Sequence, residues 1–316
     1  MSLRTTLQFR LLPAIAVAVI VITVPYFFPS AYYYRIGALT FIFALAVVGL
    51  NLLMGFAGQV SLGHAGFLGI GAYSVVIGPT TFGLPSWLCL FVGAIFSAAV
   101  AFLVGRPILK LKGHYLAVAT LGFGLLVAIV LTNEASWTGG PDGMSVPRLV
   151  LFNWQVRGSD TWYWIAGATL IGGFVLALNV MDSPTGRALQ AIHDSEIAAL
   201  MLGIDVAHKK LTIFVISAVY ASVAGSYLAL FNGHVTPDVA GFLRSIELVT
   251  MVVLGGMGSI VGSLVGAVVL VVLPQALTVF HDYEQAVLGL ILMVFMIFLR
   301  RGIVPSVAAT IIGWRK

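Results

Sequence analysis

Four polar residues lie in or beside two apolar segments near the start of the chain: Asn51, Gln59, Ser61 and His64. Polar groups are costly in an apolar surrounding, so they usually face the interior of a helix bundle or a water-filled path. Six glycines surround them, at Gly55, Gly58, Gly63, Gly66, Gly69 and Gly71. This density is typical of a broken helix whose ends line a substrate path. Close helix packing with hydrogen bonds between helices is the other interpretation, and both stay open.

Catalytic chemistry has little support in the sequence. The six histidines are dispersed, and no cysteine or carboxylate lies near His64 to indicate a metal site. The single cysteine, Cys89, excludes a disulfide within the chain. A Gly-x4-Gly-Lys-Ser/Thr phosphate loop is also missing, so the chain does not bind ATP in that way. We expect no catalytic residue, no metal and no cofactor.

A charged segment, residues 182–210, interrupts the apolar chain and holds seven of its 16 basic and 11 acidic residues. Ser183 followed by Pro184 is typical of a helix start, and Gly203 of a helix end. We predict one helix from Pro184 up to Gly203, a glycine turn, and a second helix capped by Asp205. The segment is too polar to cross a bilayer, and its alternatives are a surface for a partner protein or a loop resting on lipid headgroups.

The elements that must position these residues are membrane helices. The chain is 60% hydrophobic and 9% charged, whereas a soluble domain carries about 25% charged residues. A span needs about 20 mostly apolar residues. The candidate segments are 11–28, 36–56, 65–79, 86–105, 115–132, 162–181, 211–231, 243–257, 259–277 and 285–300. The third and eighth are short and glycine-rich, so we predict a single all-α domain over residues 1–316 with eight to ten spans, some short or broken.

Basic residues give the orientation of these spans. With ten spans and the N-terminus inside, twelve of the 16 basic residues fall on the inner side and four on the outer side. Inner loops of membrane proteins carry such an excess. We therefore expect both termini and the charged segment to be cytoplasmic. The basic residues form no stripe, so we expect membrane lipid and no nucleic acid as a partner.

Five motifs resemble the LivM-type permeases, the membrane subunits of ABC importers for branched-chain amino acids. They occur in the family's order at Gly49–Tyr73, Lys112–Gly124, Thr138–Met144, Gly186–Ile204 and Val253–Gly262. The resemblance implies a permease subunit in the bacterial inner membrane, with no enzymatic activity of its own. It also implies three kinds of partner: a second homologous permease, two ABC ATPase subunits and a periplasmic substrate-binding protein.

The resemblance also assigns roles to residues. The ATPase-coupling loop would comprise Arg187, Glu196, Ala198, Ala199 and Gly203. Ile197 separates the glutamate from the alanine pair, which departs from the general importer motif but fits this branch. The outer mouth of the pathway, or a contact for the binding protein, would comprise Thr138, Gly139, Gly140 and Asp142. A tight turn explains these last four residues equally well.

Three rival functions remain. Relatives in the broader family carry urea, amides or other amino acids, so the cargo is the least determined part of the prediction. A carrier driven by an ion gradient would need a charged residue deep in the membrane. Glu247 is the one carboxylate within a candidate span, and we place it near the outer end of that span beside Arg244. A membrane enzyme would need the histidines and carboxylates to meet in space.

Overall fold

The computed structural model describes residues 3–151, 154–277, 284–299 and 301–313. The chain is almost entirely helical. Its main helices are α1 (Leu3–Phe27), α2 (Ala31–Asn51), α3 (His64–Phe82), α4 (Ser86–Ile108), α5 (His114–Asn133), α7 (Ser159–Asp182), α10 (Val206–Asn232), α11 (Phe242–Gly255), α12 (Ile260–Leu277), α13 (Glu284–Phe298) and α14 (Ile303–Gly313). A π-helical turn, η1 (Leu52–Phe56), continues α2.

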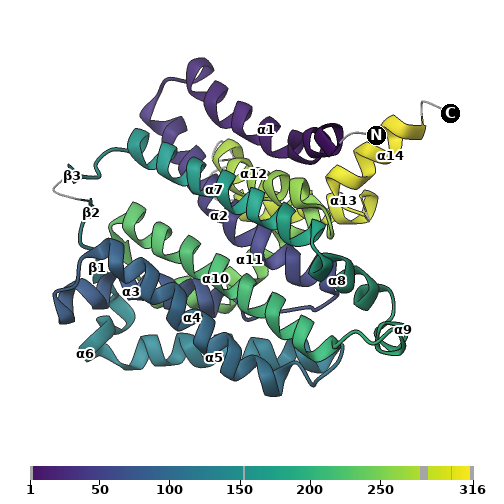
Figure 1. The fold of residues 1–316 in the computed structure, drawn as a ribbon. Coiled ribbons are helices and arrows are strands. Elements are labelled where there is room, and N and C mark those ends of the chain that lie inside the picture. Colours follow the sequence, from purple (N-terminus) through teal and green to yellow (C-terminus); the bar gives the residue numbers. More distant parts are fainter. Residues whose placement is uncertain (1–2, 152–153, 278–283, 300, 314–316) are drawn as a thin grey trace.

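Short elements join these helices. At one end of the bundle are α6 (Ala135–Thr138), the 3₁₀ turn η2 (Gly140–Asp142), and two strand pairs. Strand β1 (Met144–Ser145) pairs antiparallel with β4 (His234–Val235), and β2 (Val150–Leu151) with β3 (Trp154–Gln155). At the opposite end are α8 (Pro184–Asp194) and α9 (Glu196–Met201), and the start of α1 and α14 lie at the same end (Figure 1). The turn η3 (Pro237–Ala240) precedes α11.

The predicted membrane helix bundle is confirmed. Among the described residues, seven helices are long and apolar enough to cross a membrane: α2 with η1, α3, α4, α5, α7, α10 and α12. The apolar part of α1 is shorter, and so are α11 and α13. Each of the ten predicted segments coincides with one of these helices. The third predicted segment, 65–79, lies within the longer helix α3, which is continuous over 19 residues. The eighth, 243–257, corresponds to α11, which has only 14 residues.

Helix α10 lies at the centre of the bundle and packs against α2, α3 and α4. Glycines permit the closest of these contacts. A Cβ atom added to Gly71 of α3 would lie 1.9 Å from the Ser222 carbonyl oxygen, and one added to Gly225 would lie 1.9 Å from the Leu68 carbonyl oxygen. The two backbones therefore touch, as they do where small residues line a membrane helix interface.

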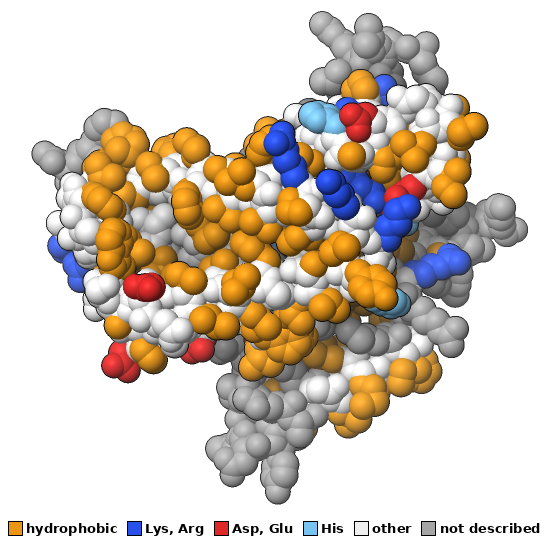
Figure 2. Space-filling model, turned by 90° about the horizontal axis from the view of Figure 1, so that it is seen from below, with side chains coloured by type: hydrophobic (Ala, Val, Ile, Leu, Met, Phe, Trp, Pro, Cys, Tyr) orange, Lys and Arg blue, Asp and Glu red, His pale blue; other side chains and the backbone are white. Residues whose placement is uncertain are grey.

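The outer helices α4 and α5 expose large hydrophobic side chains, including Phe91, Ile95 and Leu126. Seen from their side of the molecule, the surface is covered mainly by hydrophobic side chains, and most Lys and Arg side chains gather at the right-hand end (Figure 2). This pattern is typical of a lipid-facing surface with a basic end.

Segment 234–241 dips into the bundle from the end that carries β1 and β4. Pro237, Val239 and Ala240 are buried, and η3 packs between α3 and α5. The Ala240 side chain faces Gly69, where an added Cβ would lie 2.5 Å from it. Helix α11 therefore begins inside the bundle and crosses only part of it.

Candidate functional site

The polar residues predicted near the start of the chain lie around a break between α2 and α3. Residues 58–63 are not helical, and Gly58 has a φ of +66°, which favours glycine. The Leu62 amide donates to Thr120 Oγ1 of α5 at 3.1 Å, and the Ala65 amide donates to Ser245 Oγ of α11 at 3.2 Å. Hydroxyl groups of two other helices thus satisfy backbone groups that the break leaves free.

His64 bridges two serines at this break. Its Nδ1 lies 3.0 Å from Ser61 Oγ, and its Nε2 lies 2.5 Å from Ser217 Oγ of α10. All three side chains are buried. Neither ring nitrogen is bonded to a carboxylate, and the described residues contain no cluster of three or more His, Cys, Asp or Glu side chains that could hold a metal ion. These hydrogen bonds join the start of α3 to α10, which is a structural role.

Asn51 holds the end of α2 against the turn between α11 and α12. Its Nδ2 donates to the Ser259 carbonyl at 2.8 Å and to Ser263 Oγ at 2.9 Å, and its Oδ1 accepts from the Gly258 amide at 2.9 Å. With both ends of the amide bonded, Asn51 is explained by packing. A Cβ on Gly55 would lie 2.0 Å from Asn51 Oδ1 and 2.1 Å from the Gly258 nitrogen, so this junction requires glycine.

Gln59 differs from its neighbours. Its side chain is buried, yet neither its Oε1 nor its Nε2 has a hydrogen-bond partner among the described residues. A buried amide without partners is costly, and such a group needs an explanation such as water or a ligand. Of the four residues predicted to line a path, Gln59 is therefore the one that the geometry of the break leaves without a structural role.

Arg244 and Glu247 lie deeper in the bundle than the sequence predicted. The guanidinium of Arg244 bonds to Glu247 and lies over the ring of Phe43, 5.2 Å from its centre. Phe43 is near the middle of α2, and the adjacent Ser245 bonds to the start of α3 at the break. The prediction of an outer position was wrong because segment 234–241 carries the chain inward before α11 begins.

The charged segment contains two short helices where one was predicted. Ser195 is extended, with φ −161° and ψ 112°, and its Oγ accepts from the Ala198 amide at 3.3 Å. It therefore caps α9 and separates it from α8. The predicted cap at Ser183 is confirmed, since its Oγ accepts from Thr185 and Gly186. Asp205 caps α10, with Oδ1 3.0 Å from the His208 amide.

Gly203 makes the predicted turn after α9. Its φ is +79°, its amide donates to the Leu200 carbonyl, and the Ile204 amide donates to the Ala199 carbonyl. This pair of bonds is the Schellman arrangement that ends many helices at glycine. Ala199 is buried with Ile192 in a small apolar cluster between α8, α9 and α10.

Glu196 contacts its own chain. Its carboxylate bonds to Lys210 Nζ, whose side chain is 8% exposed, and lies 3.8 Å from Lys112 Nζ, whose side chain is 78% exposed. Arg187 also stays within the segment, where its Nη1 donates to the Asp182 carbonyl at 3.2 Å. Glu196 therefore fixes α9 to the start of α10.

The outward face of α9 is apolar, and the sequence analysis did not single it out. The exposed fractions are 74% for Ile197, 58% for Leu200, 84% for Met201 and 77% for Leu202. Four neighbouring large apolar side chains at the basic end of the protein are more typical of a protein contact than of a solvated loop. Their signal in the sequence was the apolar run Leu200-Met201-Leu202 within a charged segment.

The predicted outer-mouth residues form a tight turn. Thr138 is buried and bonds to the carbonyl oxygens of Leu131 and Glu134. Gly139 and Gly140 have φ values of +76° and +65°. The Asp142 side chain is exposed, and its carbonyl accepts from His234 Nε2 at 3.1 Å. Asp142 is thus the one member of the set whose side chain is presented outward.

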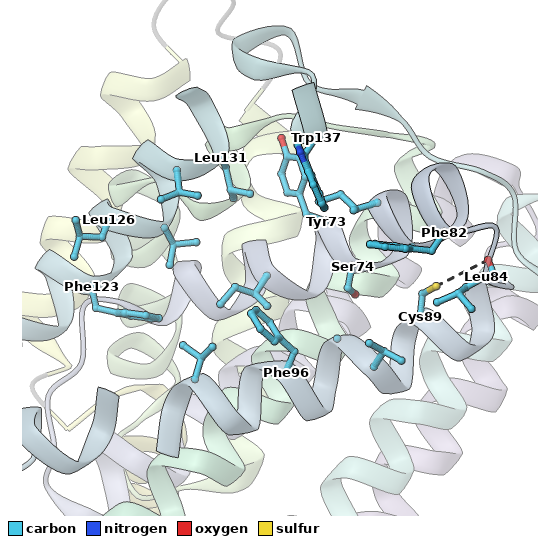
Figure 3. Close-up of a pocket in the computed structure, with 18 residues that line it drawn as sticks. Tyr73, Ser74, Phe82, Leu84, Cys89, Phe96, Phe123, Leu126, Leu131 and Trp137 are labelled. Atoms are coloured by element: carbon cyan, nitrogen blue, oxygen red, sulfur yellow. Dashed lines mark hydrogen bonds between the residues drawn. The ribbon is translucent and has the colours of Figure 1, made fainter. Parts of the chain in front are cut away.

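An apolar cavity of about 700 Å³ lies between α3, α4 and α5. Figure 3 shows Tyr73 and Trp137 at one side of it, and Phe96 and Phe123 on facing helices. The lining is almost wholly apolar, and the helices beside it expose hydrophobic faces. A groove of this kind suits a lipid chain better than a polar cargo.

Comparison with known proteins gives the family. A family model described as the permease component of the branched-chain amino acid transport system matches residues 32–297. The chain is 35% identical over 294 residues to the high-affinity branched-chain amino acid transport system permease protein LivM of Escherichia coli K12, covering 85% of this chain and 69% of LivM. It is 28% identical over 286 residues to LivH of Salmonella typhimurium, covering 83% and 90%.

A more distant relative is the probable LivM permease of Methanocaldococcus jannaschii, 24% identical over 212 residues, which cover 64% of this chain and 60% of the relative. No solved structure matches the chain. The family match covers most of the helical bundle, including the break after α2 and the charged segment. The chain belongs to the family of permease components of branched-chain amino acid transport systems.

Proposed function

We propose that this chain is one of two permease subunits of an ATP-driven importer for leucine, isoleucine and valine. The observation that carries the proposal is the family match over residues 32–297, together with relatives named for that transport. The chain is similar to both LivM and LivH, which are separate permease proteins. This supports pairing with a second, homologous permease, and the path lies between the two.

The proposed assembly places the protein in the bacterial inner membrane. The charged segment, α14 and the start of α1 share one end of the bundle (Figure 1). The excess of basic residues predicted on the inner side supports a cytoplasmic position for that end. A periplasmic binding protein delivers cargo at the opposite end, where Asp142 is exposed. Two ATPase subunits bind at the cytoplasmic end and hydrolyse ATP.

In this proposal the exposed face of α9 contacts an ATPase subunit. Ile197, Leu200 and Met201 supply the apolar contact. Glu196 and Gly203, which the resemblance placed at the contact, act by positioning: the ion pair with Lys210 fixes the start of α9, and the glycine turn fixes its end. A short helix held at both ends transmits a push without bending.

The test is reconstitution of this chain with its partner permease and ATPases in liposomes that also receive the binding protein. We expect ATP-dependent uptake of labelled leucine. Met201→Asp places a charge on the α9 face, so the ATPase should no longer co-purify and uptake should fall to background. Gln190→Asp is the matched control, because Gln190 is exposed on α8, away from that face.

The rivals give different results. Uptake that persists without ATP, or that follows an imposed ion gradient, would identify a secondary carrier. This test is included because such a carrier needs a charged residue deep in the membrane, and Glu247 lies deeper than the sequence predicted. Uptake of urea or an amide in preference to leucine would identify another cargo of the same family. Gln59→Leu tests the path residue, with reduced uptake and unchanged assembly expected, whereas Asn51→Leu should impair assembly itself.

A further inference from the structure

A second cavity, of about 340 Å³, lies beside α11. Its walls come from four helices, α2, α11, α12 and α13. Unlike the groove between α3, α4 and α5, it contains charged groups, Arg244 and Glu247. Its volume is in the range of small-molecule sites.

The position of these charges argues against a lipid-facing role. Arg244 stacks over Phe43 near the middle of α2, and the neighbouring Ser245 bonds to the break at the start of α3. The side chain of Arg244 is 32% exposed and that of Glu247 is 46% exposed in the single chain. Charges at such a depth face a water-filled cavity or another protein, because lipid does not solvate them.

The pair leaves hydrogen-bonding capacity unused. One amino group of the guanidinium bonds to Glu247, while the buried Nε–H of Arg244 has no partner among the described residues. A guanidinium has five donors in a planar fork that matches a carboxylate. The Glu247 carboxylate can likewise accept from an ammonium group.

Most of the remaining lining is apolar, and Thr250 and Gln275 add polar groups to it. Leu270 and Val271 of α12, Leu292 of α13 and Met251 of α11 line the same cavity as the charged pair. A ligand that fits both parts must carry one negative and one positive charge close together, with an aliphatic group beside them. A free amino acid with an apolar side chain has this structure.

We propose that the cavity beside α11 is a transient binding site for the transported zwitterion, with Arg244 receiving the α-carboxylate and Glu247 the α-ammonium group. The inference rests on the proposed function and adds the site and the roles of the two residues. Leu270, Val271 and Leu292 contact the side chain of the cargo. An apolar wall discriminates weakly between side chains that differ by one methylene, so leucine, isoleucine and valine should share the site.

Binding is measured on the detergent-purified complex without its binding protein, using labelled leucine in a scintillation proximity assay. Saturable binding is expected. Leucinamide and N-acetylleucine each keep one of the two charges of leucine. The affinity of each competitor should be lower than that of leucine by a factor of roughly ten or more, because each loses one hydrogen bond to a charged group. Equal competition by both, or no saturable binding by a complex that transports leucine, would overturn the proposal.

Variants assign the residues. Arg244→Gln and Glu247→Gln should each weaken leucine binding and uptake by roughly tenfold or more. Arg244→Lys keeps the charge without the fork and should be intermediate. Leu243→Ala is the control, because Leu243 is 74% exposed on α11 and does not line the cavity.

If the charge variants fail to assemble, Leu270→Trp keeps the ion pair and fills the cavity. It should abolish binding while the complex still assembles, and wild-type binding by this variant would refute the site. A wild-type complex that takes up no leucine at all would instead overturn the proposed function. Normal uptake by the wild type and by Arg244→Gln alike would overturn the binding site alone.

Discussion

At the scale of single residues, buried hydroxyl groups hold the bundle together. Ser217 bonds His64, Ser245 bonds the Ala65 amide, and Thr120 bonds the Leu62 amide. Each hydroxyl comes from a different helix and satisfies a polar group at one break in the chain. Because lipid offers no replacement partner, each such bond matters where the break is buried.

Ser217→Ala should destabilise the protein by about 1–3 kcal/mol, because it leaves a ring nitrogen of His64 buried without a partner. The measurement is thermal unfolding of the purified protein in detergent. Thr212→Ala is the matched control on the same helix, since among the described residues Thr212 Oγ1 bonds to the His208 carbonyl within α10 alone. An equal decrease in unfolding temperature in the two variants would contradict the role given to Ser217.

Glu196→Gln should also destabilise the charged segment, by about 1–3 kcal/mol, because the buried ammonium group of Lys210 loses its countercharge. Lys112→Gln removes the exposed partner at 3.8 Å and should have almost no effect, as is usual for exposed pairs. Limited proteolysis of 182–210 provides the measurement. Faster cleavage in the Lys112 variant than in the Glu196 variant would contradict the prediction that Lys210, and not Lys112, is the partner through which Glu196 stabilises the segment.

At the scale of elements, hydropathy and glycine density predicted much of the fold. Within the described residues, each of the ten apolar segments is helical over most of its length, since a bilayer requires its spanning segments to satisfy their own backbone groups. The glycines around Ser61 correctly indicated a break. The dip at 234–241 gave no such signal, because a short mixed segment has neither helical nor strand periodicity. The depth of Glu247 depends on that dip and was therefore missed.

Side-chain partners were harder to predict than elements. Ser195 was read as part of one continuous helix, although its hydroxyl caps α9. The polar residues of the first segments were found, but Ser217 and Ser245 are single serines in apolar helices and carry no pattern that indicates a contact. The ion pair of Glu196 with Lys210 was not predicted, because Lys210 lies in the next helix.

The contact between α3 and α10 depends on glycine. Gly225→Ala should lower the yield of folded protein and cost about 1–3 kcal/mol, since the new Cβ would lie 1.9 Å from the Leu68 carbonyl oxygen. Gly122→Ala on α5 is the control, because an added Cβ has no neighbour there within 4 Å. Size-exclusion chromatography in detergent with a thermal scan measures both. If Gly225→Ala has the elution profile and unfolding temperature of the wild type, α3 and α10 can move apart without a loss of stability, and the prediction is wrong.

At the scale of the whole molecule, the bundle has two unlike ends. One carries the strand pairs and the Thr138 turn, and the other carries α8, α9 and most of the basic side chains (Figures 1 and 2). This polarity fits the proposed importer, in which cargo arrives at one surface and ATP is used at the other. The apolar flank formed by α4 and α5 lies between them.

The orientation can be tested with single cysteines. In a Cys89→Ala background, which removes the chain's one cysteine, Asp142→Cys should react with a membrane-impermeant maleimide in intact spheroplasts. A cysteine in place of Gln190 on α8 should react only after permeabilisation. The reverse pattern would place the charged segment outside the cell and contradict the proposed orientation.

The apolar face of α9 also has a consequence for the life of the protein in the cell. In the proposed assembly, a subunit synthesised in excess of its ATPase would display Ile197, Leu200, Met201 and Leu202 to the cytosol. Chaperones and membrane proteases select such surfaces for removal. In the proposed assembly, the face that receives the ATPase would therefore also mark unassembled copies for degradation, and the amount of the ATPase would set the amount of permease that survives.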